Sequence, residues 1–226
     1  MKVIKLICVF LLITETTSCQ QQVANKKILD KDFQEYVNLF KEARLPFSTY
    51  EELYATDTIS RAFVKKYICN QASCLKDWSG YDIEFSSCVS LVSNGNFIML
   101  IHDESTDGGS IRKLSTYNLI GKKIDELEIL ADKSFHGHRN DDEVSGYDVQ
   151  SIIDNEYHIE TKRLELYPKK WKEGNQRYTY GRYIEYQYKI EPNGEIVKFS
   201  EKDHGKQKYL VGTYDPNAMP TLKLAE

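Results

Sequence analysis

The segment "YTYGRYIEYQYKIEPNGEIVKFS" (178–200) alternates between apolar and polar positions and then reverses direction at a turn. One face collects its aromatic and aliphatic residues: Tyr178, Tyr180, Ile184, Tyr186, Tyr188 and Ile190. Thr179, Glu185, Gln187 and Lys189 take the opposite face. A period of two residues is that of a β-strand with one buried side. Because "PNG" (192–194) supplies turn residues, the segment predicts an antiparallel hairpin.

The same period extends through most of the chain on both sides of this hairpin. It is found in "YDIEFSSCVSLV" (81–92), "IRKLSTYNLI" (111–120), "KIDELEILAD" (123–132), "DVQSIID" (148–154), "EYHIETKRLELYP" (156–168) and "KYLVGTY" (208–214). "FIMLI" (97–101) is apolar on both faces, as is typical of a central strand covered by a helix. Short turns between these segments predict an antiparallel meander of about eight strands. The sheet is expected to be curved. The pattern does not distinguish a sheet that closes as a barrel from one that folds as a sandwich.

Slips in the alternation predict two β-bulges, one between Ile124 and Leu127 and one near Arg163.

Two helices are expected before the sheet. In "LDKDFQEYVNLFKEAR" (29–44), Asp30 or Asp32 is a candidate N-cap and Pro46 is expected to end the helix. Its apolar stripe consists of Phe33, Tyr36, Val37, Phe40 and Ala43. A second helix is expected in "DTISRAFVKKYIC" (57–69), with its acidic start at Asp57 and with Ile59, Phe63 and Tyr67 on one face. The fold class is therefore α+β, mainly β: one globular domain at 28–226, with helices in 28–68 and the sheet in 81–214.

The N-terminal segment has the features of an export signal. Lys2 and Lys5 precede "LICVFLLI" (6–13), an apolar run too short to span a bilayer. The run leads into "TETTSC", which resembles the lipobox of bacterial lipoproteins and ends at Cys19, although Thr16 stands where Leu is usual. The alternative is an ordinary signal peptide with an incidental cysteine. The resemblance implies removal of 1–18 and acylation of Cys19 (palmitate included), which anchors the protein to a membrane of the cell envelope. The residues after Cys19, "QQQVANKK", contain no aromatic residue and no apolar period, so we expect 19–27 to be a tether.

The chain also resembles uncharacterised lipoproteins of the Bacteroides group. The resemblance rests on the lipobox, on "LPFS" (45–48) and on the hairpins "YNLIGKKIDELEIL" (117–130) and "YQYKIEPNGEIVKF" (186–199). It implies a location and a sheet-rich fold, and no activity. In some lipoproteins of this group, acidic residues just after the cysteine direct export to the outer surface. None directly follows Cys19, so the resemblance implies a periplasm-facing domain rather than a surface-exposed one.

The remaining cysteines suggest one disulfide. Cys69 and Cys74 bracket the polar segment "CNQASC", and an envelope compartment permits oxidation, so a local bridge is the favoured interpretation. A Cys69–Cys88 bridge and a zinc site made of all three cysteines are the alternatives.

"FHGHRNDDEVSG" (135–146) is the segment where histidines and acids crowd together. His136, His138, Asp141 and Asp142 are candidate metal ligands, but no apolar residue within 136–143 fixes their side chains. We interpret the segment as a solvated loop.

The sequence carries few signs of chemistry. It has no G-x-S-x-G segment and no phosphate-binding loop, and we expect no cofactor. With a formal net charge of −4 and no basic patch, the chain is not expected to bind nucleic acid. We predict a non-enzymatic, protein-binding module of accessory or immunity-like type, whose partner is unknown. The alternatives are a small-ligand or glycan binder that uses Tyr178, Tyr180, Tyr186 and Tyr188, or a metal-dependent hydrolase at His136 and His138. The tyrosines are also explained by simple packing of a half-buried sheet face.

Overall fold

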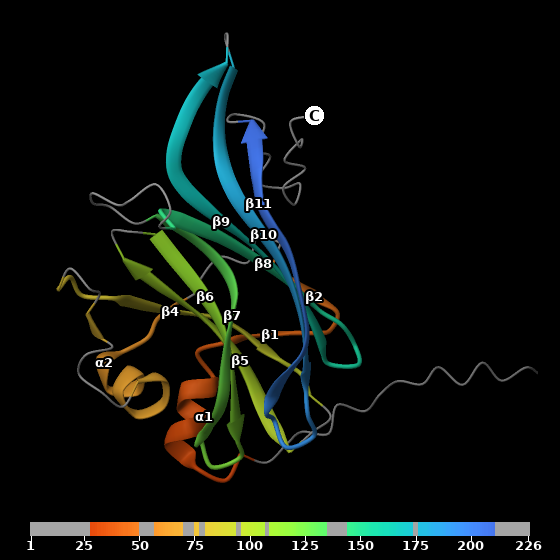
Figure 1. Ribbon diagram of the computed structural model, residues 1–226. Helices are drawn as coiled ribbons and strands as arrows, with labels where there is room; N and C mark the ends of the chain where they lie inside the picture. The colour runs from red at the N-terminus through yellow and green to blue at the C-terminus, as the bar shows by residue number, and fades with distance from the viewer. Residues whose placement is uncertain are drawn as a thin grey trace, which may run out of the picture.

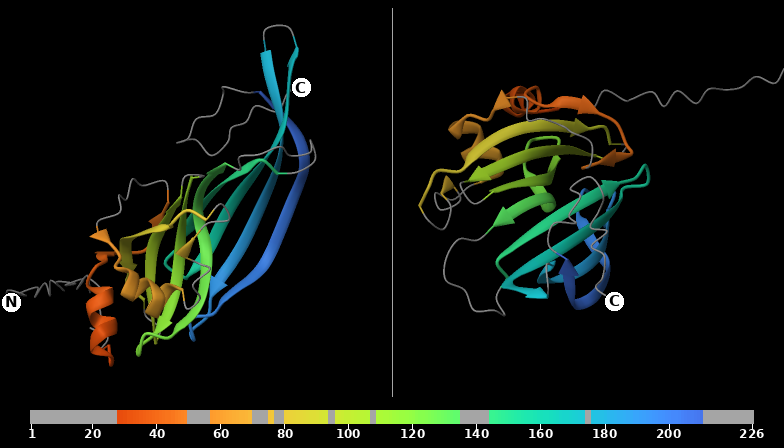
Figure 2. Two further views of the ribbon diagram at one scale, coloured as in Figure 1. Left: turned by 90° about the vertical axis from the view of Figure 1, so that its left-hand side faces the viewer. Right: turned by 90° about the horizontal axis from the view of Figure 1, so that it is seen from above.

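The computed structural model describes residues 28–49, 57–69, 75–76, 80–93, 96–106, 109–134, 144–173 and 176–210. A single large sheet dominates this part of the chain and curls strongly, so that its two halves face each other (Figures 1 and 2). The helices cover the outer side of the half that is nearer the N-terminus. The mainly-β α+β class predicted from the alternation is confirmed.

The long strands follow one another across the sheet in chain order, and each pairs antiparallel with the next. They are β4 (Glu84–Leu91), β5 (Phe97–Thr106), β6 (Gly109–Asn118), β7 (Lys123–Ser134), β8 (Gly146–Ile153), β9 (His158–Glu173), β10 (Gln176–Ile190) and β11 (Ile196–Leu210). This order confirms the predicted meander. Three short strands add to it: β1 (Lys41–Ala43) pairs parallel with β4, β2 (Phe47–Ser48) pairs with β8, and β3 (Asp57–Thr58) pairs with β4.

The first helix is shorter than its apolar stripe. Helix α1 (Lys31–Val37) begins where Asp30 caps it, with the Asp30 carboxylate accepting a hydrogen bond from the Phe33 amide at 2.7 Å. The helix ends at Val37, so the prediction that it continues to Pro46 was wrong. Ala43 lies in β1 instead, opposite Leu91, because an edge of β4 offers the backbone there a ladder of hydrogen bonds.

The second helix starts later than expected. Ser60, not Asp57, caps it, and Asp57 instead pairs with Ser87 through β3. After one short α-helical segment, α2 (Arg61–Phe63), the chain widens into a π-helix at Val64–Ile68.

The bulges were predicted with mixed success. The β6–β7 register shifts beside Ile124, as expected, and again beside Ile129. The register of β9 against β8 and β10 is unbroken around Arg163, so the bulge predicted there was wrong. The slip in the alternation that suggested this bulge has another cause. Leu164 is buried on the face opposite Arg163, so apolar residues occupy both faces of β9 and the strand needs no extra residue.

In the described residues, two large apolar cores lie on the two faces of the sheet, and a smaller cluster contains Ala131, Tyr147 and Val149. Inside the curve, Phe97, Ile101 and Leu114 pack with residues of the C-terminal half such as Ile159 and Ile190. The outer core joins the helices to the sheet through Phe33, Tyr36, Tyr67, Leu100 and Tyr117. Strand β5 is therefore covered on both faces, which confirms the expectation from "FIMLI".

The curled sheet meets itself at one end without becoming a barrel. The β10–β11 turn, residues 191–195, packs against β6 and β7. Thr116 Oγ1 donates a hydrogen bond to the Gly194 carbonyl at 2.7 Å, and the Ile196 amide donates one to Asp125 Oδ2 at 2.9 Å. We call these two bonds the latch. No ladder joins β11 to β7 in the described part of the chain, so the sheet is open and strongly curved.

Within the described residues, no helix is both long enough and apolar enough to cross a membrane.

Candidate functional site

Several predicted site residues lie outside the described residues. These are Cys19, Cys74, His136, His138, Asp141 and Asp142. Among the residues that are described, no group of three or more His, Cys, Asp or Glu is placed to hold a metal ion.

The two described cysteines differ in state. Cys69 is disulfide-bonded, whereas Cys88 is a free thiol buried beneath the inner face of the sheet. The alternatives of a Cys69–Cys88 bridge and of a three-cysteine zinc site were therefore wrong. Burial raises the pKa of Cys88 to about 12, so its thiol stays protonated and is a poor nucleophile.

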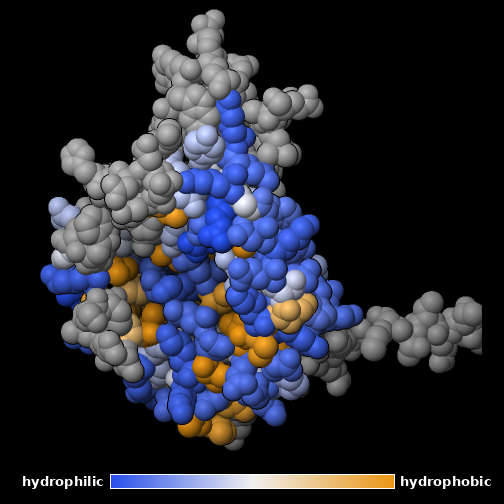
Figure 3. All heavy atoms as spheres, viewed as in Figure 1, coloured by the Kyte–Doolittle hydropathy of each residue, from blue (hydrophilic) through white to orange (hydrophobic). Residues whose placement is uncertain are grey.

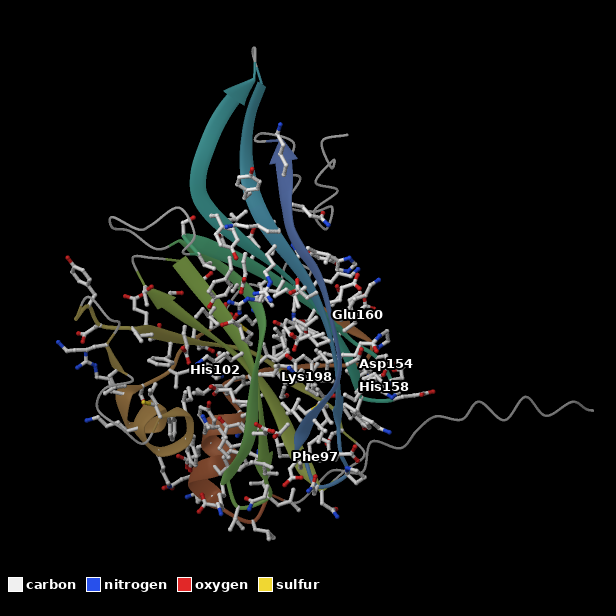
Figure 4. The ribbon with its side chains drawn as sticks, viewed as in Figure 1. Phe97, His102, Asp154, His158, Glu160 and Lys198 are labelled. Carbon is white, nitrogen blue, oxygen red and sulfur yellow. The ribbon has the colours of Figure 1, made fainter. Side chains whose placement is uncertain are left out.

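A hollow of about 350 Å³ opens on the concave face of the sheet, within the range of small-ligand pockets. Its walls come from five consecutive strands, β7 to β11, through Leu127, Glu128, Val149, Thr161, Arg163, Tyr186, Tyr188 and Lys198. We call it the concave cavity. Register explains the grouping, because Tyr186 lies opposite Thr161 across the β9–β10 pair and Arg163 lies opposite Val149 across the β8–β9 pair. Figure 4 labels Lys198 on the last of these strands.

Half of the predicted tyrosine stripe lines this cavity. The rings of Tyr186 and Tyr188 lie 6.0 Å apart, inclined at 37°. Neither hydroxyl makes a hydrogen bond within the described part of the chain. Burial raises the pKa of both phenols, with the Glu201 carboxylate adding to the effect at Tyr186. Both therefore remain protonated near neutral pH and can donate or accept a hydrogen bond.

The other half of the stripe does not reach the cavity. Tyr180 lies further along the strand, where Lys206 Nζ is 5.9 Å from its ring and 3.9 Å from the ring of Tyr167. Tyr180 keeps the phase of Tyr186 on β10, but it stands six residues before it, roughly 20 Å along an extended strand. The side chain of Tyr178 lies outside the described residues.

Arg163 is the central charged group of the cavity. Its guanidinium lies over the Tyr147 ring at 4.0 Å, and its Nε donates a hydrogen bond to Glu165 Oε1 at 3.1 Å. Glu128 Oε1 is 3.8 Å from Arg163 Nη1, and Glu128 Oε2 accepts a hydrogen bond from the Tyr147 hydroxyl at 3.1 Å. Stacking and ion pairing together fix the plane of the guanidinium. Arg163 Nη2 remains without a hydrogen bond inside the described chain.

Lys198 stands at the rim. Its Nζ is 2.6 Å from Glu201 Oε2 and 5.4 Å from the centre of the Tyr186 ring. Its side chain is 47% exposed, so this pair is well solvated and contributes little to stability.

Sequence reasoning missed Arg163, Glu128 and Lys198. Their signal was weak but present: Arg163 is in phase with Ile159 and Thr161 on β9, so it belongs to the buried face of that strand. Identifying its acidic partner requires the pairing of strands, because Glu128 is 35 residues away and beside a bulge.

A second polar cluster lies on the other face of the sheet, beside the helices. His102, labelled in Figure 4, is fully buried, and its Nε2 is 3.4 Å from Glu104 Oε1. Lys113 Nζ bridges Glu104 at 2.9 Å and Glu126 at 3.2 Å. Lys123 Nζ donates a hydrogen bond to the Ile68 carbonyl at 2.7 Å and pairs with Glu126 at 3.0 Å. This network ties the end of the π-helix to β7, and we interpret it as structural.

The carboxylates of this cluster are stabilised in their charged form. Burial alone would raise the pKa of Glu104, but the hydrogen bond from His102 and the charge of Lys113 outweigh it and lower the pKa. For Glu126, burial is likewise outweighed by Lys113 and Lys123, and its pKa is also lowered.

Comparison of the chain with protein-family models, with curated proteins and with solved structures finds no match. The concave cavity therefore has to be interpreted from its own chemistry.

Proposed function

We propose that the protein is a lipid-anchored, non-enzymatic binding domain of the bacterial cell envelope, and that the concave cavity holds a small polar ligand. The observation that carries this proposal is that Tyr186 and Tyr188, whose hydroxyls make no hydrogen bond in the described chain, line a cavity of about 350 Å³. Packing of a half-buried sheet face explains buried rings. It does not explain why an open hollow of this size beside them is also lined by hydrogen-bonding and charged groups, namely Thr161, Arg163 and Lys198.

Binding without turnover fits the groups around the cavity. The Glu128 carboxylate is held by the Tyr147 hydroxyl and lies beside Arg163, and Glu165 is also bound to Arg163. In this arrangement the two carboxylates hold the Arg163 guanidinium in place, which is a positioning role that binding requires.

The test uses the purified full-length protein and a panel of uncharged and charged small polar molecules, glycans included, read out by the shift in Tm. A ligand that binds only the native state stabilises it by RT ln(1 + L/Kd), where L is the free ligand concentration, so the shift in Tm rises with ligand concentration. The shift should vanish in Tyr186→Ala and Tyr188→Ala and survive in Gln187→Ala, because Gln187 is the exposed residue between them on the opposite face. Equal shifts in all three variants would place the ligand elsewhere.

The anchor is tested separately. Labelled palmitate should be incorporated into the wild-type protein and not into Cys19→Ala, and protease added to intact cells should leave a periplasm-facing domain uncut. Incorporation of labelled palmitate into both the wild-type protein and Cys19→Ala would show that Cys19 is not the acylated residue.

A protein partner is the second candidate, and the free edge of β11 favours it. In the described part of the chain, no strand pairs with the outer edge of this 15-residue strand. Such an edge can add a strand from another protein. Lys198, Lys202 and Lys206 stand along β11, and lysines at an edge oppose uncontrolled pairing, so only a complementary, acidic strand is expected there. Capture of a partner that is lost in Ser200→Pro would support this candidate.

A further inference from the structure

The charges on the concave face are already matched inside the protein. Arg163 has Glu165 at 3.1 Å and Glu128 at 3.8 Å. Arg182, next to it across the sheet, lies 3.6 Å from Glu165 and 2.6 Å from Asp203. The rim pair of Lys198 and Glu201 completes the set at 2.6 Å.

This pairing selects against a charged ligand. An anion bound at the open Nη2 of Arg163 would lie close to the Glu128 and Glu165 carboxylates, which already offset the charge of the guanidinium and would repel a second negative group. A cation would meet Arg163 and Lys198 in the same space. Neither sign is favoured, so the ligand that fits is uncharged.

The other groups that line the concave cavity are aromatic rings and atoms that donate or accept hydrogen bonds. The inclined rings of Tyr186 and Tyr188 offer a surface on which a flat, weakly polar face can rest. Their hydroxyls donate and accept, and Arg163 Nη2 donates. A sugar ring presents this combination: C–H groups on one face, and around its edge hydroxyls that each donate and accept.

We propose that the concave cavity binds one neutral saccharide residue, with its C–H face against Tyr186 and Tyr188 and its hydroxyls bonded to the two phenols and to Arg163. The inference rests on the proposed function, because it names the ligand class of the same cavity. The volume lies near the lower limit for small-ligand pockets, which suits one residue or the end of a glycan rather than a whole oligosaccharide.

The experiment uses the full-length protein in detergent on an array of immobilised glycans of three kinds: neutral, ending in a uronic acid, and phosphorylated. Affinities for the glycans retained are then measured by titration calorimetry. We expect retention of neutral glycans only. Tyr188→Ala should weaken binding at least about 10-fold, because it removes both a stacked ring and a hydrogen bond. Tyr188→Phe, which keeps the ring, should weaken it less, and Gln187→Ala should change it by less than about twofold.

Three results would overturn the inference in different ways. Retention of the acidic or phosphorylated glycans alone would reject a neutral ligand while leaving the cavity as a binding site. If Tyr186→Ala and Tyr188→Ala bind neutral glycans with unchanged affinity, the concave cavity is not their binding site. An array without any retained glycan, together with a Tm shift from some other small molecule that needs Tyr188, would reject saccharides and keep the proposed function; the absence of both signals would reject the two together.

Discussion

Replacing Gly194 with alanine is the sharpest test of how the curled sheet is held together. Gly194 has φ = +92° at the tip of the β10–β11 turn, and its carbonyl accepts the Thr116 hydrogen bond of the latch. A Cβ added there would lie 2.7 Å from Ile124 Cδ1 and 3.1 Å from Phe97 Cβ. The Ile124 methyl group is the end of a flexible side chain and can move aside. Phe97 Cβ is fixed to β5 and cannot, so the turn has to lift.

The magnitude follows from two separate effects. A side chain at positive φ costs about 1–2 kcal/mol, because Cβ crowds the backbone. Forcing a methyl group into packed space costs about 1–3 kcal/mol more. We therefore expect Gly194→Ala to lower the free energy of unfolding by about 2–5 kcal/mol, a large part of the total for a domain of this kind.

The chain supplies a matched control for this substitution. Gly205 has φ = +75° on β11, but a Cβ there would meet no atom within 4 Å. Gly205→Ala should therefore show only the backbone effect, about 1–2 kcal/mol. Equilibrium urea unfolding of both variants gives the difference, with the m-value as a check that both unfold from the same native state. An equal loss of stability in the two variants would refute the packing of the turn against Phe97 and Ile124.

Three further predictions follow from other parts of the structure. Thr116→Val should lower the free energy of unfolding by about 1–3 kcal/mol in the same urea assay, since it leaves the buried Gly194 carbonyl without its donor. Thr116→Ser keeps a hydroxyl and should lower the free energy of unfolding by less. An equal decrease in the two variants would contradict the latch. Cys88 should resist maleimide at pH 8 until the protein unfolds, because its pKa is raised to about 12 and it is buried; rapid labelling of its peptide in native protein, seen by mass spectrometry, would argue against this burial. The lowered pKa of Glu104 should stabilise the fold fully above its ordinary value near 4.5, and this stability should be lost as pH falls through the lowered value. Glu104→Gln should therefore flatten the acid side of the stability–pH curve, and an unchanged curve would count against the pair with Lys113.

The sheet was predictable because its alternation is local. Each hairpin partner follows directly in the chain, so the phase of Ile184, Tyr186 and Tyr188 and the turn at 191–195 were enough to place β10 against β11. The end of α1 was not predictable, because Ala43 continues the helical stripe and leaves it only to pair with Leu91, about 50 residues later. A long-range hydrogen-bond ladder overrides local periodicity in such a place.

Only the part of the cavity that comes from a single strand was predictable from the sequence, because only that part depends on local alternation. Tyr186 and Tyr188 could be grouped from one strand, but which part of that strand borders the cavity depends on its pairing with the neighbouring strands. Arg163 and Glu128 meet because β8 sets the register between β7 and β9, and no spacing within one segment encodes that.

The latch and the cavity are parts of one arrangement. Asp125 and Ile196, which form the second bond of the latch, each stand two residues before a cavity residue, Leu127 on β7 and Lys198 on β11. The outermost two of the five strands that line the cavity, β7 and β11, do not pair with each other in the described chain, so the distance between them at this end depends on the packed turn rather than on a ladder. A change that lifts the turn should therefore widen the cavity and weaken binding as well as stability. Gly194→Ala therefore tests both stability and ligand affinity, the affinity being measured under conditions where the variant is still native. If the variant is less stable but binds the ligand with unchanged affinity, the latch does not set the shape of the cavity.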